Sequence, residues 1–367
     1  MRAVILVGGQ GTRLRPITYD IPKALVPLRN HPFMGYMVDF LRSGGIDGAV
    51  LSLGYLPDPI QAYFSGRDDL DGFSVDYAVE DRALGTAGGI KNAQQYLDGG
   101  PLVVVNGDVL TGMDLTKAIE RHRATDALAT VTLTSVEDPT AYGLVEVDHE
   151  MLVHRFIEKP AYDDVTTNLI NAGVYVMEPE VLDMIPAGRE VSIEREIFPR
   201  LQAEGRLRAH VSSSYWRDIG TPRSYLAASH DVLSGAVGAG ENFEYLDVDP
   251  STRVGKNVKL LPPVSVAAGC DIEAGATIGG RSALGRGCRI GEGSVVEGSI
   301  LLDGAEVEAG AVVRGSILGP RARAGQGAIV RGLSVLGAGC VIGEGNVLDQ
   351  GVRVNPGVIL PPRSLRF

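Results

Sequence analysis

The first 234 residues alternate short runs rich in β-forming apolar residues with stretches whose apolar residues recur at helical spacing. Runs of the first kind include AVILV (3–7), GAVLSLGY (48–55), FSVDYAV (73–79) and PLVVVNGD (101–108). Helical spacing marks residues 33–45, 57–64, 87–97 and 115–123, and the first of these stretches ends in Gly44-Gly45, a glycine C-cap. This alternation predicts a parallel, largely buried sheet with helices on both faces. From Ala127 onward strands follow with little helix between them, which predicts an added antiparallel part and hence a mixed sheet.

Beyond about Asp249 the apolar residues follow a different rule, a period of six. The series consists of Val266, Ile272, Ile278, Leu284, Ile290, Val296 and Leu302, and glycines recur three places after several of its members. Such a period predicts a parallel β-helix, whereas a flexible glycine-rich tail would not keep aliphatic residues in phase. The register slips around Leu302 to Val307, as at an insertion, and resumes less regularly through Val313, Ile329, Val341 and Val347. We therefore expect a catalytic domain over 1–234, a linker over 235–249 and a β-helix over 250–367.

Composition narrows the functional classes. The net charge of −11 argues against nucleic-acid binding, although a local cluster of Arg and Lys can still bind an anionic substrate. No apolar run approaches the ~20 residues of a membrane span, so we expect a soluble protein without membrane contact. The three cysteines lack metal spacing and predict small core residues in a reducing, cytoplasmic setting. The six histidines show no zinc spacing, and no serine-nucleophile motif is present.

The first apolar run leads into LVGGQGTRLRPITYDIPKALVPL (6–28). Gly8, Gly9 and Gly11 allow backbone N–H groups to approach a phosphate closely, and Arg13 and Lys23 add positive charge. The sequence does not match the dinucleotide fingerprint or the P-loop pattern. By itself, a purely structural turn explains the glycines equally well, and a surface position explains Arg15.

With the motifs that follow, the chain resembles the sugar-1-phosphate nucleotidyltransferases, or NDP-sugar pyrophosphorylases. Their signature is similar to GGQGTRLRPIT and PKALVPL, with departures here only at the apolar Ile17 and Ala24. The later segments that match in order are LGTAGGI, NGDVL, FIEKP, NAGVYV, SIEREIFP and WRDIGTP. Within the family the likeness is greatest to bacterial mannose-1-phosphate guanylyltransferases that carry a left-handed β-helix. The resemblance implies a Rossmann-like α/β nucleotidyltransferase domain with a mixed sheet, followed by a left-handed parallel β-helix, and Thr12 joins the glycines as a nucleotide-binding residue.

Two aspartates are candidate metal ligands. Asp108 follows a buried strand at the edge where open α/β sheets bind ligands, and Asp218 lies beside the only tryptophan. An ordinary Asn-Gly-Asp turn and an aspartate cap before the helix that Pro222 begins are the structural alternatives. The resemblance implies that Asp108 and Asp218 together bind the catalytic Mg²⁺.

The sugar phosphate has its own candidates. In FIEKP, Glu158 could accept hydrogen bonds from sugar hydroxyls and Lys159 could neutralise the phosphate, with a solvated ion pair as the alternative. Asn171 precedes a buried run, where an amide needs hydrogen-bond partners. Tyr142 and Gly143 resemble the sugar-side loop of the family.

The nucleotide base has a candidate loop at LGTAGG. Gly85, Thr86 and Gly88 resemble the loop that reads the base edge, and Thr86 could instead start a helix. Further along, Ser192 predicts a helix N-cap, and Ile193, Ile197 and Leu201 predict packing rather than chemistry.

The expected reaction transfers a nucleoside monophosphate from a nucleoside triphosphate to a sugar 1-phosphate with release of pyrophosphate, with GTP and mannose 1-phosphate as the first candidates. Arg13, Lys23, Asp108, Lys159 and Asp218 are the expected catalytic residues. Thymidylyl, uridylyl or adenylyl transfer to glucose 1-phosphate or a cyclitol phosphate stays open, as does a catalytically silent regulatory subunit. An acyltransferase is disfavoured because no histidine follows His230. We expect a homo-oligomer that forms through the β-helix.

Overall fold

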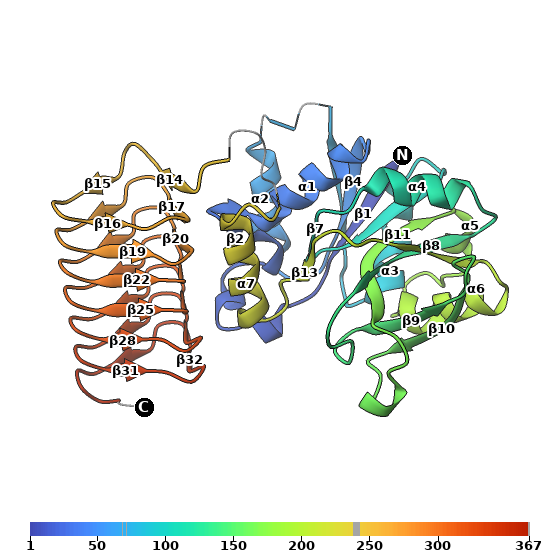
Figure 1. The fold of residues 1–367 in the computed structure, drawn as a ribbon. Coiled ribbons are helices and arrows are strands. Elements are labelled where there is room, and N and C mark those ends of the chain that lie inside the picture. The colour runs from blue at the N-terminus through green and yellow to red at the C-terminus, as the bar shows by residue number, and fades with distance from the viewer. Residues whose placement is uncertain (68, 71, 238–242, 366–367) are drawn as a thin grey trace. The chain divides into compact units, whose positions relative to one another are not determined.

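The computed structural model describes residues 1–67, 69–70, 72–237 and 243–365. These residues form two compact units (Figure 1). The first unit comprises Met1–Gln10 and Met34–Trp216, and the second comprises Gly11–Phe33 and Arg217–Phe367. Each unit is described separately.

The first unit is built on a mixed sheet, as predicted. Its main path runs β10-β9-β11-β6-β1-β4-β5, and β8 and β12 extend it from β11. The strands of this sheet are β1 (Arg2–Val7), β4 (Gly48–Leu53), β5 (Ser74–Val79), β6 (Leu102–Asn106), β8 (Ala129–Ser135), β9 (Gly143–Val147), β10 (Val153–Glu158), β11 (Leu169–Met177) and β12 (Leu207–Val211). β1 pairs in parallel with β4 and β6, whereas β11 is antiparallel to β6, β8 and β9. The expected change from a parallel to an antiparallel arrangement is therefore confirmed, and it falls between β6 and β11.

Four helices of this unit, α1 to α4, lie at the helical patterns in the sequence, whereas no pattern predicted α5. The helices are α1 (Phe33–Ser43), α2 (Pro57–Ser65), α3 (Gly85–Ala93), α4 (Leu115–Arg123), α5 (Glu180–Asp183) and α6 (Phe198–Ala203), and the short strand β7 (Val109–Thr111) follows β6. The glycine C-cap after α1 is confirmed, because Gly45 has φ 75° and its N–H binds the carbonyl of Arg42.

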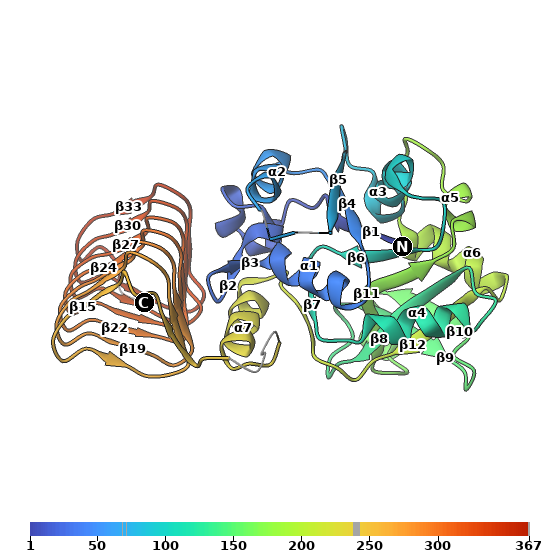
Figure 2. The same cartoon turned by 90° about the horizontal axis from the view of Figure 1, so that it is seen from above.

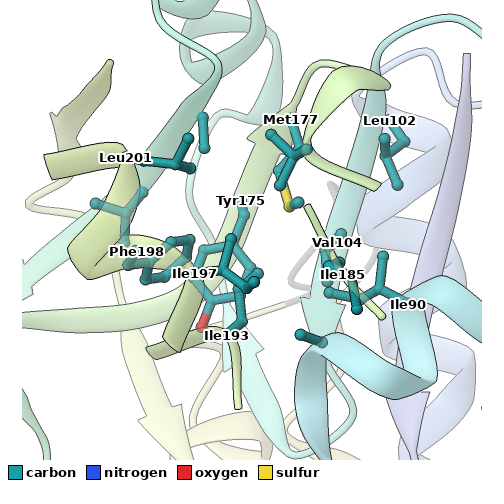
Figure 3. Close-up of a cluster of buried hydrophobic side chains, with 14 of the residues drawn as sticks. Ile90, Leu102, Val104, Tyr175, Met177, Ile185, Ile193, Ile197, Phe198 and Leu201 are labelled. Atoms are coloured by element: carbon teal, nitrogen blue, oxygen red, sulfur yellow. The ribbon is translucent and has the colours of Figure 1, made fainter. Parts of the chain in front are cut away.

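The core of the first unit lies where α3 and α6 meet the sheet (Figure 3). Ile90, Val104 and Tyr175 are buried there, and the rings of Tyr175 and Phe198 pack edge to face at 5.1 Å. Ile193, Ile197 and Leu201 are each 0% exposed, so the packing role predicted for them is confirmed. A π-helical turn over Ile193–Ile197 leads directly into α6.

In the second unit, the segment Gly11–Phe33 packs with α7 (Pro222–Leu233). The phenol of Tyr225 is buried and donates to the carbonyl of Pro27, 2.7 Å away. β2 (Pro27–Leu28) and β3 (His31–Pro32) form a small antiparallel pair within the segment. The charged half of the glycine-rich turn thus belongs to the same compact unit as the C-terminal third of the chain.

That C-terminal third forms three parallel sheets of short strands, which confirms the predicted β-helix (Figures 1 and 2). The first sheet stacks β14 (Leu246–Val248), β17 (Val264–Val266), β20 (Ser282–Leu284), β23 (Ile300–Leu301), β26 (Ile317–Leu318), β29 (Val335–Leu336) and β32 (Arg353–Val354). The second stacks β15 (Arg253–Val254), β18 (Asp271–Ile272), β21 (Arg289–Ile290), β24 (Glu306–Val307), β27 (Arg323–Ala324), β30 (Val341–Ile342) and β33 (Ile359–Leu360). The third stacks β16 (Lys259–Leu260), β19 (Thr277–Gly279), β22 (Val295–Glu297), β25 (Val312–Arg314), β28 (Ile329–Val330) and β31 (Val347–Leu348).

The register slip in the repeat is a shortening rather than the insertion predicted. Leu284 pairs with Leu301 and Leu301 with Leu318, so Leu302 does not continue the inward series. In these two coils the repeat is 17 residues, as from Ser282 to Ser299 and from Ser299 to Ser316. One corner of each coil, at Gly298 and at Gly315, is one residue shorter.

The later half of the repeat is also more regular than predicted. Ala324, Val330, Leu336, Ile342, Leu348 and Val354 continue at intervals of six and are buried. The predicted members Ile329, Val341 and Val347 are only half-buried, because each stands one place before an inward residue. Alternation along a strand sends neighbouring side chains to opposite faces, which explains the misassignment.

Other expectations concern single features. Cys270, Cys288 and Cys340 are buried and form no disulfide, as predicted. Of the predicted linker, residues 238–242 lie outside the described residues, and β14 begins at Leu246. None of the helices that the structure describes has the length and apolar character needed to cross a membrane.

Candidate active site

The glycine-rich turn after β1 is divided between the two units, and Gly8 and Gly9 belong to the first. A Cβ on Gly8 would lie 3.2 Å from Oε1 of Glu80, whereas a Cβ on Gly9 would meet nothing within 4 Å. Gly54, which follows β4, needs its hydrogen for a different reason, since its Cβ would lie 2.7 Å from the carbonyl of Gly8. The turn is therefore closely packed at Gly8 and open at Gly9, where a ligand can approach the backbone.

The second part of the turn belongs to the other unit and carries the charge. Gly11 has φ 60° and precedes a 3₁₀ turn over Thr12–Leu14, and its carbonyl accepts the hydroxyl of Thr18 at 2.7 Å. A Cβ on Gly11 would lie 3.2 Å from Cβ of Lys23. Arg13 is exposed and Lys23 is half-buried. The structure thus brings Lys23 directly against the turn that contains Arg13.

Asp218 lies close to Arg13 in the same unit. The strand β13 (Trp216–Asp218) ends there, and Oδ2 of Asp218 accepts the N–H of Gly220 at 3.0 Å. A Cβ on Gly220 would lie 2.6 Å from that oxygen and 2.8 Å from Nη2 of Arg13, so only glycine lets the two side chains share this space. The alternative role of Asp218 as a helix cap is wrong, because Thr221 caps α7 and forms a capping box with Ser224.

Asp108, in the first unit, occupies the turn between β6 and β7. Gly107 precedes it and donates its N–H to the carbonyl of Leu6 at 2.9 Å. A Cβ on Gly107 would lie 2.4 Å from the same carbonyl, so this glycine lets the turn pack against the end of β1. β7 is held in turn by Tyr215, whose carbonyl accepts the N–H of Gly112 at 3.0 Å. Asp108 therefore lies at the carboxyl end of β6, beside the strand that leads into the glycine-rich turn.

In the predicted base loop, two glycines lie so close to another segment of backbone that a larger residue would not fit. Gly85 has φ 70°, and a Cβ there would lie 2.6 Å from the carbonyl of Val191. A Cβ on Gly88 would lie 2.8 Å from the carbonyl of Arg189. The loop is therefore clamped against residues 189–191, and its glycines are required for that contact whatever ligand it binds.

The N-cap of α3 is Leu84, so Thr86 does not cap this helix. Its side chain instead connects the base loop to the turn over Ile193–Ile197. The hydroxyl of Thr86 donates to Oε2 of Glu194 at 2.9 Å and accepts the N–H of Ile193 at 2.8 Å. Ser192 caps the following turn as predicted, because its hydroxyl accepts the N–H of Arg195. Glu194, two residues after this cap, is thus a partner of the base loop.

The predicted sugar-side residues meet at one end of the β9–β10 hairpin. Gly143 pairs with Glu158, and the N–H of Lys159 donates to the carbonyl of Tyr142 at 3.0 Å. Lys159 has φ 53° and an exposed side chain. Burial raises the pKa of Glu158, and the nearby carboxylate of Glu194 raises it further. The side chain of Glu158 is half-buried at this end of the hairpin.

Asn171 has the hydrogen-bond partners that its position demands. Its amide donates to the hydroxyl of Tyr175 at 2.8 Å, and its side-chain oxygen accepts the N–H of Gly173 at 2.9 Å. Trp216 is held beside this segment, because its indole N–H donates to the carbonyl of Ala172, the residue after Asn171, at 2.8 Å. The rings of Trp216 and Tyr142 stand edge to face with centroids 5.3 Å apart, so Tyr142 and the tryptophan form one aromatic wall.

Sequence reasoning missed Glu80, which follows β5. Its Oε1 accepts the hydroxyl of Ser52 at 2.7 Å, and its Oε2 accepts the N–H of Leu84 at 3.1 Å. It therefore touches the end of β4, the turn at Gly8 and the start of the base loop. The available signal was its position at the carboxyl end of a parallel strand, five residues before Gly85, where such folds bind ligands.

A mixed α/β sheet with polar residues at its strand ends is thus followed along the chain by a parallel β-helix. Residues 2–235 match the family described as nucleotidyl transferase, and residues 260–366 match the family described as the GMPPB C-terminal domain. The chain therefore belongs to the nucleotidyl transferase family, and its reaction class is that of the sugar-1-phosphate nucleotidyltransferases.

Individual relatives agree with this assignment. The chain is 40% identical to a mannose-1-phosphate guanylyltransferase of Mycobacterium tuberculosis, over 83% of this chain and 81% of that protein. It is 33% identical to a mannose-1-phosphate guanyltransferase of Pichia angusta over 100% of this chain and 97% of that one. A UTP–glucose-1-phosphate uridylyltransferase of Synechocystis is 34% identical over 83% of each chain.

Among solved structures, HddC from Yersinia pseudotuberculosis complexed with GMP-PN superposes with a TM-score of 0.55 and 32% identity. The match covers 63% of this chain and 99% of that one. A putative glucose-1-phosphate thymidylyltransferase from Bacillus anthracis gives a TM-score of 0.59 at 26% identity, over 66% and 98% of the two chains.

Proposed function

We propose that the protein transfers GMP from GTP to mannose 1-phosphate, giving GDP-mannose and pyrophosphate. The observation that carries the choice of base is the carboxylate of Glu80, which accepts hydrogen bonds from Ser52 and from the N–H of Leu84 at the start of the base loop. The choice of sugar is supported by the relatives described as mannose-1-phosphate guanylyltransferases. Uridylyl transfer to glucose 1-phosphate is the second candidate, because a relative of similar identity is described so.

The base argument rests on hydrogen-bond chemistry. A carboxylate only accepts hydrogen bonds, and its oxygens have lone pairs beyond those used by Ser52 and Leu84. The Watson–Crick edge of guanine offers two adjacent donors, N1–H and N2–H, whereas uracil and thymine offer one donor flanked by two carbonyl acceptors. Glu80 therefore favours guanine over a pyrimidine base, which would place carbonyl oxygen against carboxylate oxygen.

The chemical step needs no covalent enzyme intermediate. A phosphate oxygen of mannose 1-phosphate attacks the α-phosphorus of GTP in line, the new O–P bond forms, and the bond to the β-phosphate bridge breaks. The electron pair of that bond leaves with pyrophosphate, so charge accumulates on the departing oxygens. We assign Arg13 to the leaving phosphates, Lys23 to the triphosphate and Lys159 to the incoming sugar phosphate. Positioning and charge neutralisation then supply the rate enhancement.

Asp108 and Asp218 fit the Mg²⁺ that the family implies. Mg²⁺ prefers oxygen ligands, is often held by only one or two carboxylates, and takes the rest of its coordination from phosphates and water. Oδ2 of Asp218 already has the N–H of Gly220 as an orienting partner. When bound, the ion withdraws charge from the phosphate oxygens. We propose that these two aspartates hold it.

We also propose that the molecule forms a homo-oligomer through the β-helix. The support is apolar surface at the terminal coils, where Leu261 is 51% and Ile359 is 70% exposed. Light scattering coupled to gel filtration tests this, and a monomeric mass at micromolar concentration would contradict it.

The test of the proposed reaction is a matrix of GTP, UTP, dTTP and ATP against mannose, glucose and galactose 1-phosphates, with released pyrophosphate as the readout. We expect the highest kcat/KM for GTP with mannose 1-phosphate and no turnover in excess EDTA. Preference for UTP with glucose 1-phosphate would favour the second candidate. No pyrophosphate with any pair would favour the silent regulatory subunit.

A further inference from the structure

The segment Gly11–Phe33, which carries Thr12, Arg13 and Lys23, lies against one particular face of the β-helix. The relevant face is the outward side of the first sheet, the one that begins at β14 and ends at β32. Register places one residue per coil in a single outward column: Asp247, Ser265, Ala283, Ile300, Ile317, Val335 and Arg353. We call this set the outward column.

The central side chains of the outward column are apolar and covered by other parts of the same unit. Its four central members, from Ala283 to Val335, are apolar and at most 3% exposed. Five of the seven corresponding positions of the second sheet, those from β15 to β27, are instead charged, and the last two are Val341 and Ile359. The charged residues form ion pairs, such as Arg253 with Asp271 and Arg289 with Glu306. α7 packs against β20 in the column. Apolar residues on one outward face and charges on another distinguish a docking face from a solvent face.

Polar contacts join the two ends of the column to the segment. At the first coils, the amide of Asn30 donates to the hydroxyl of Ser265 at 2.9 Å, and Arg29 donates to the carbonyl of Glu244 at 2.8 Å. At the far end, Nη1 of Arg353 donates to the carbonyls of Arg13 and Arg15, each at 3.2 Å. The segment is thus fastened to the column at both ends.

We propose that Arg353 is a positioning residue for the triphosphate, acting through the loop that carries Arg13. Its guanidinium binds the two carbonyls on either side of Leu14 and so fixes the 3₁₀ turn over Thr12–Leu14. With that turn fixed, the side chain of Arg13 is presented without the conformational cost of ordering the loop when substrate binds. The β-helix then contributes to the reaction through one residue near its C-terminal end. This inference rests on the proposed function.

The test compares Arg353→Ala and Arg353→Lys with Arg323→Ala in the full chain. Arg323 is the matched control, because it stands outward on the second sheet and pairs with Glu306 and Glu308. The first readout is amide hydrogen exchange in a peptide spanning residues 11–19, where the N–H groups of Leu14 and Arg15 bind Gly11 and Thr12. The second is the KM for GTP and, separately, for mannose 1-phosphate.

For Arg353→Ala we expect exchange in this peptide to rise about tenfold and the KM for GTP to rise about five- to tenfold, with the KM for mannose 1-phosphate within about twofold of wild type. Arg353→Lys should show smaller increases than Arg353→Ala in both exchange and the KM for GTP. Arg323→Ala should leave both quantities at their wild-type values. Unchanged exchange and unchanged KM for GTP would overturn the proposal, and so would faster exchange spread evenly over all coils. If the wild-type protein turned over no nucleotide, the proposed reaction would fail, but the exchange comparison would still decide the role of Arg353.

Discussion

The hydrogen bonds of Thr86 allow a quantitative prediction for Thr86→Val. Valine keeps the shape of threonine but removes one bond to Glu194 at 2.9 Å and one from the N–H of Ile193 at 2.8 Å. Ile193 is 0% exposed, so its N–H is left without a partner and without access to water. Such a loss costs about 1–3 kcal/mol for the orphaned donor and about 1 kcal/mol for the bond to the carboxylate, hence about 2–4 kcal/mol of unfolding free energy.

Differential scanning calorimetry measures this cost. In a unit of roughly 200 residues, each kcal/mol shifts Tm by about 2–4 °C, so we expect the transition of the first unit to fall by about 4–16 °C. Thr86→Ser retains the hydroxyl and should stay within about 2 °C of wild type. Thr116→Val, on the exposed side of α4, is the control for the substitution itself.

Activity gives a second readout for the same variant. The base loop loses its tie to Glu194, so the KM for the nucleoside triphosphate should rise about tenfold in Thr86→Val while the variant remains folded at 25 °C. A Tm within about 1 °C of wild type would refute the reasoning, because the two bonds would then have no role in holding the loop.

Three further predictions concern charged groups of the site. Lys23→Ala keeps the Cβ that packs on Gly11 and should leave Tm unchanged while lowering kcat about 100-fold, whereas wild-type kinetics would remove Lys23 from the mechanism. Glu80→Gln replaces one acceptor with a donor and should lower kcat/KM for GTP about tenfold while raising it for UTP, and an unchanged base preference would contradict the assignment. Burial and the carboxylate of Glu194 raise the pKa of Glu158 above its ordinary value of 4.5. The folded protein therefore keeps the proton of Glu158 to a higher pH than the unfolded chain does. The contribution of this residue to the free energy of unfolding falls as the pH rises from 4.5 through the raised pKa. The Tm difference between Glu158→Gln and wild type should therefore be about 1–2 °C more positive at pH 8 than at pH 4, and the variant should have a higher KM for the sugar phosphate. A Tm difference that does not change with pH would contradict the raised pKa of Glu158.

Much of the fold could be predicted from local pattern. The strands of the mixed sheet have runs of apolar residues long enough to identify them, and α4 coincides with its predicted range, Leu115–Arg123. The β-helix was visible because one inward residue recurs in every short strand. Short corners at Gly298 and Gly315 interrupt the period of six. Beyond them, outward aliphatic residues such as Ile329 stand one place before the inward ones, so the sequence pattern alone does not separate the two sets.

The candidate site was predictable only where a motif carries it. Arg13, Lys23 and Asp218 lie in recognisable segments, and the structure brings them together around Gly11 and Gly220. Glu80 lies in no motif, and only the pairing of β4 with β5 brings it beside Ser52. The partnership of Thr86 with Glu194 spans 108 residues of sequence and depends on tertiary packing, which no local pattern encodes.

The measurement that tests the central claim most directly is isotopic. Mannose 1-phosphate labelled with ¹⁸O at its non-bridging phosphate oxygens is incubated with the protein, GTP and Mg²⁺. The ¹⁸O content of each product is then determined by mass spectrometry. Attack of the sugar phosphate on the α-phosphorus predicts that GDP-mannose carries all of the label and pyrophosphate carries none. Label in pyrophosphate, or labelled inorganic phosphate without GDP-mannose, would contradict the transfer described here.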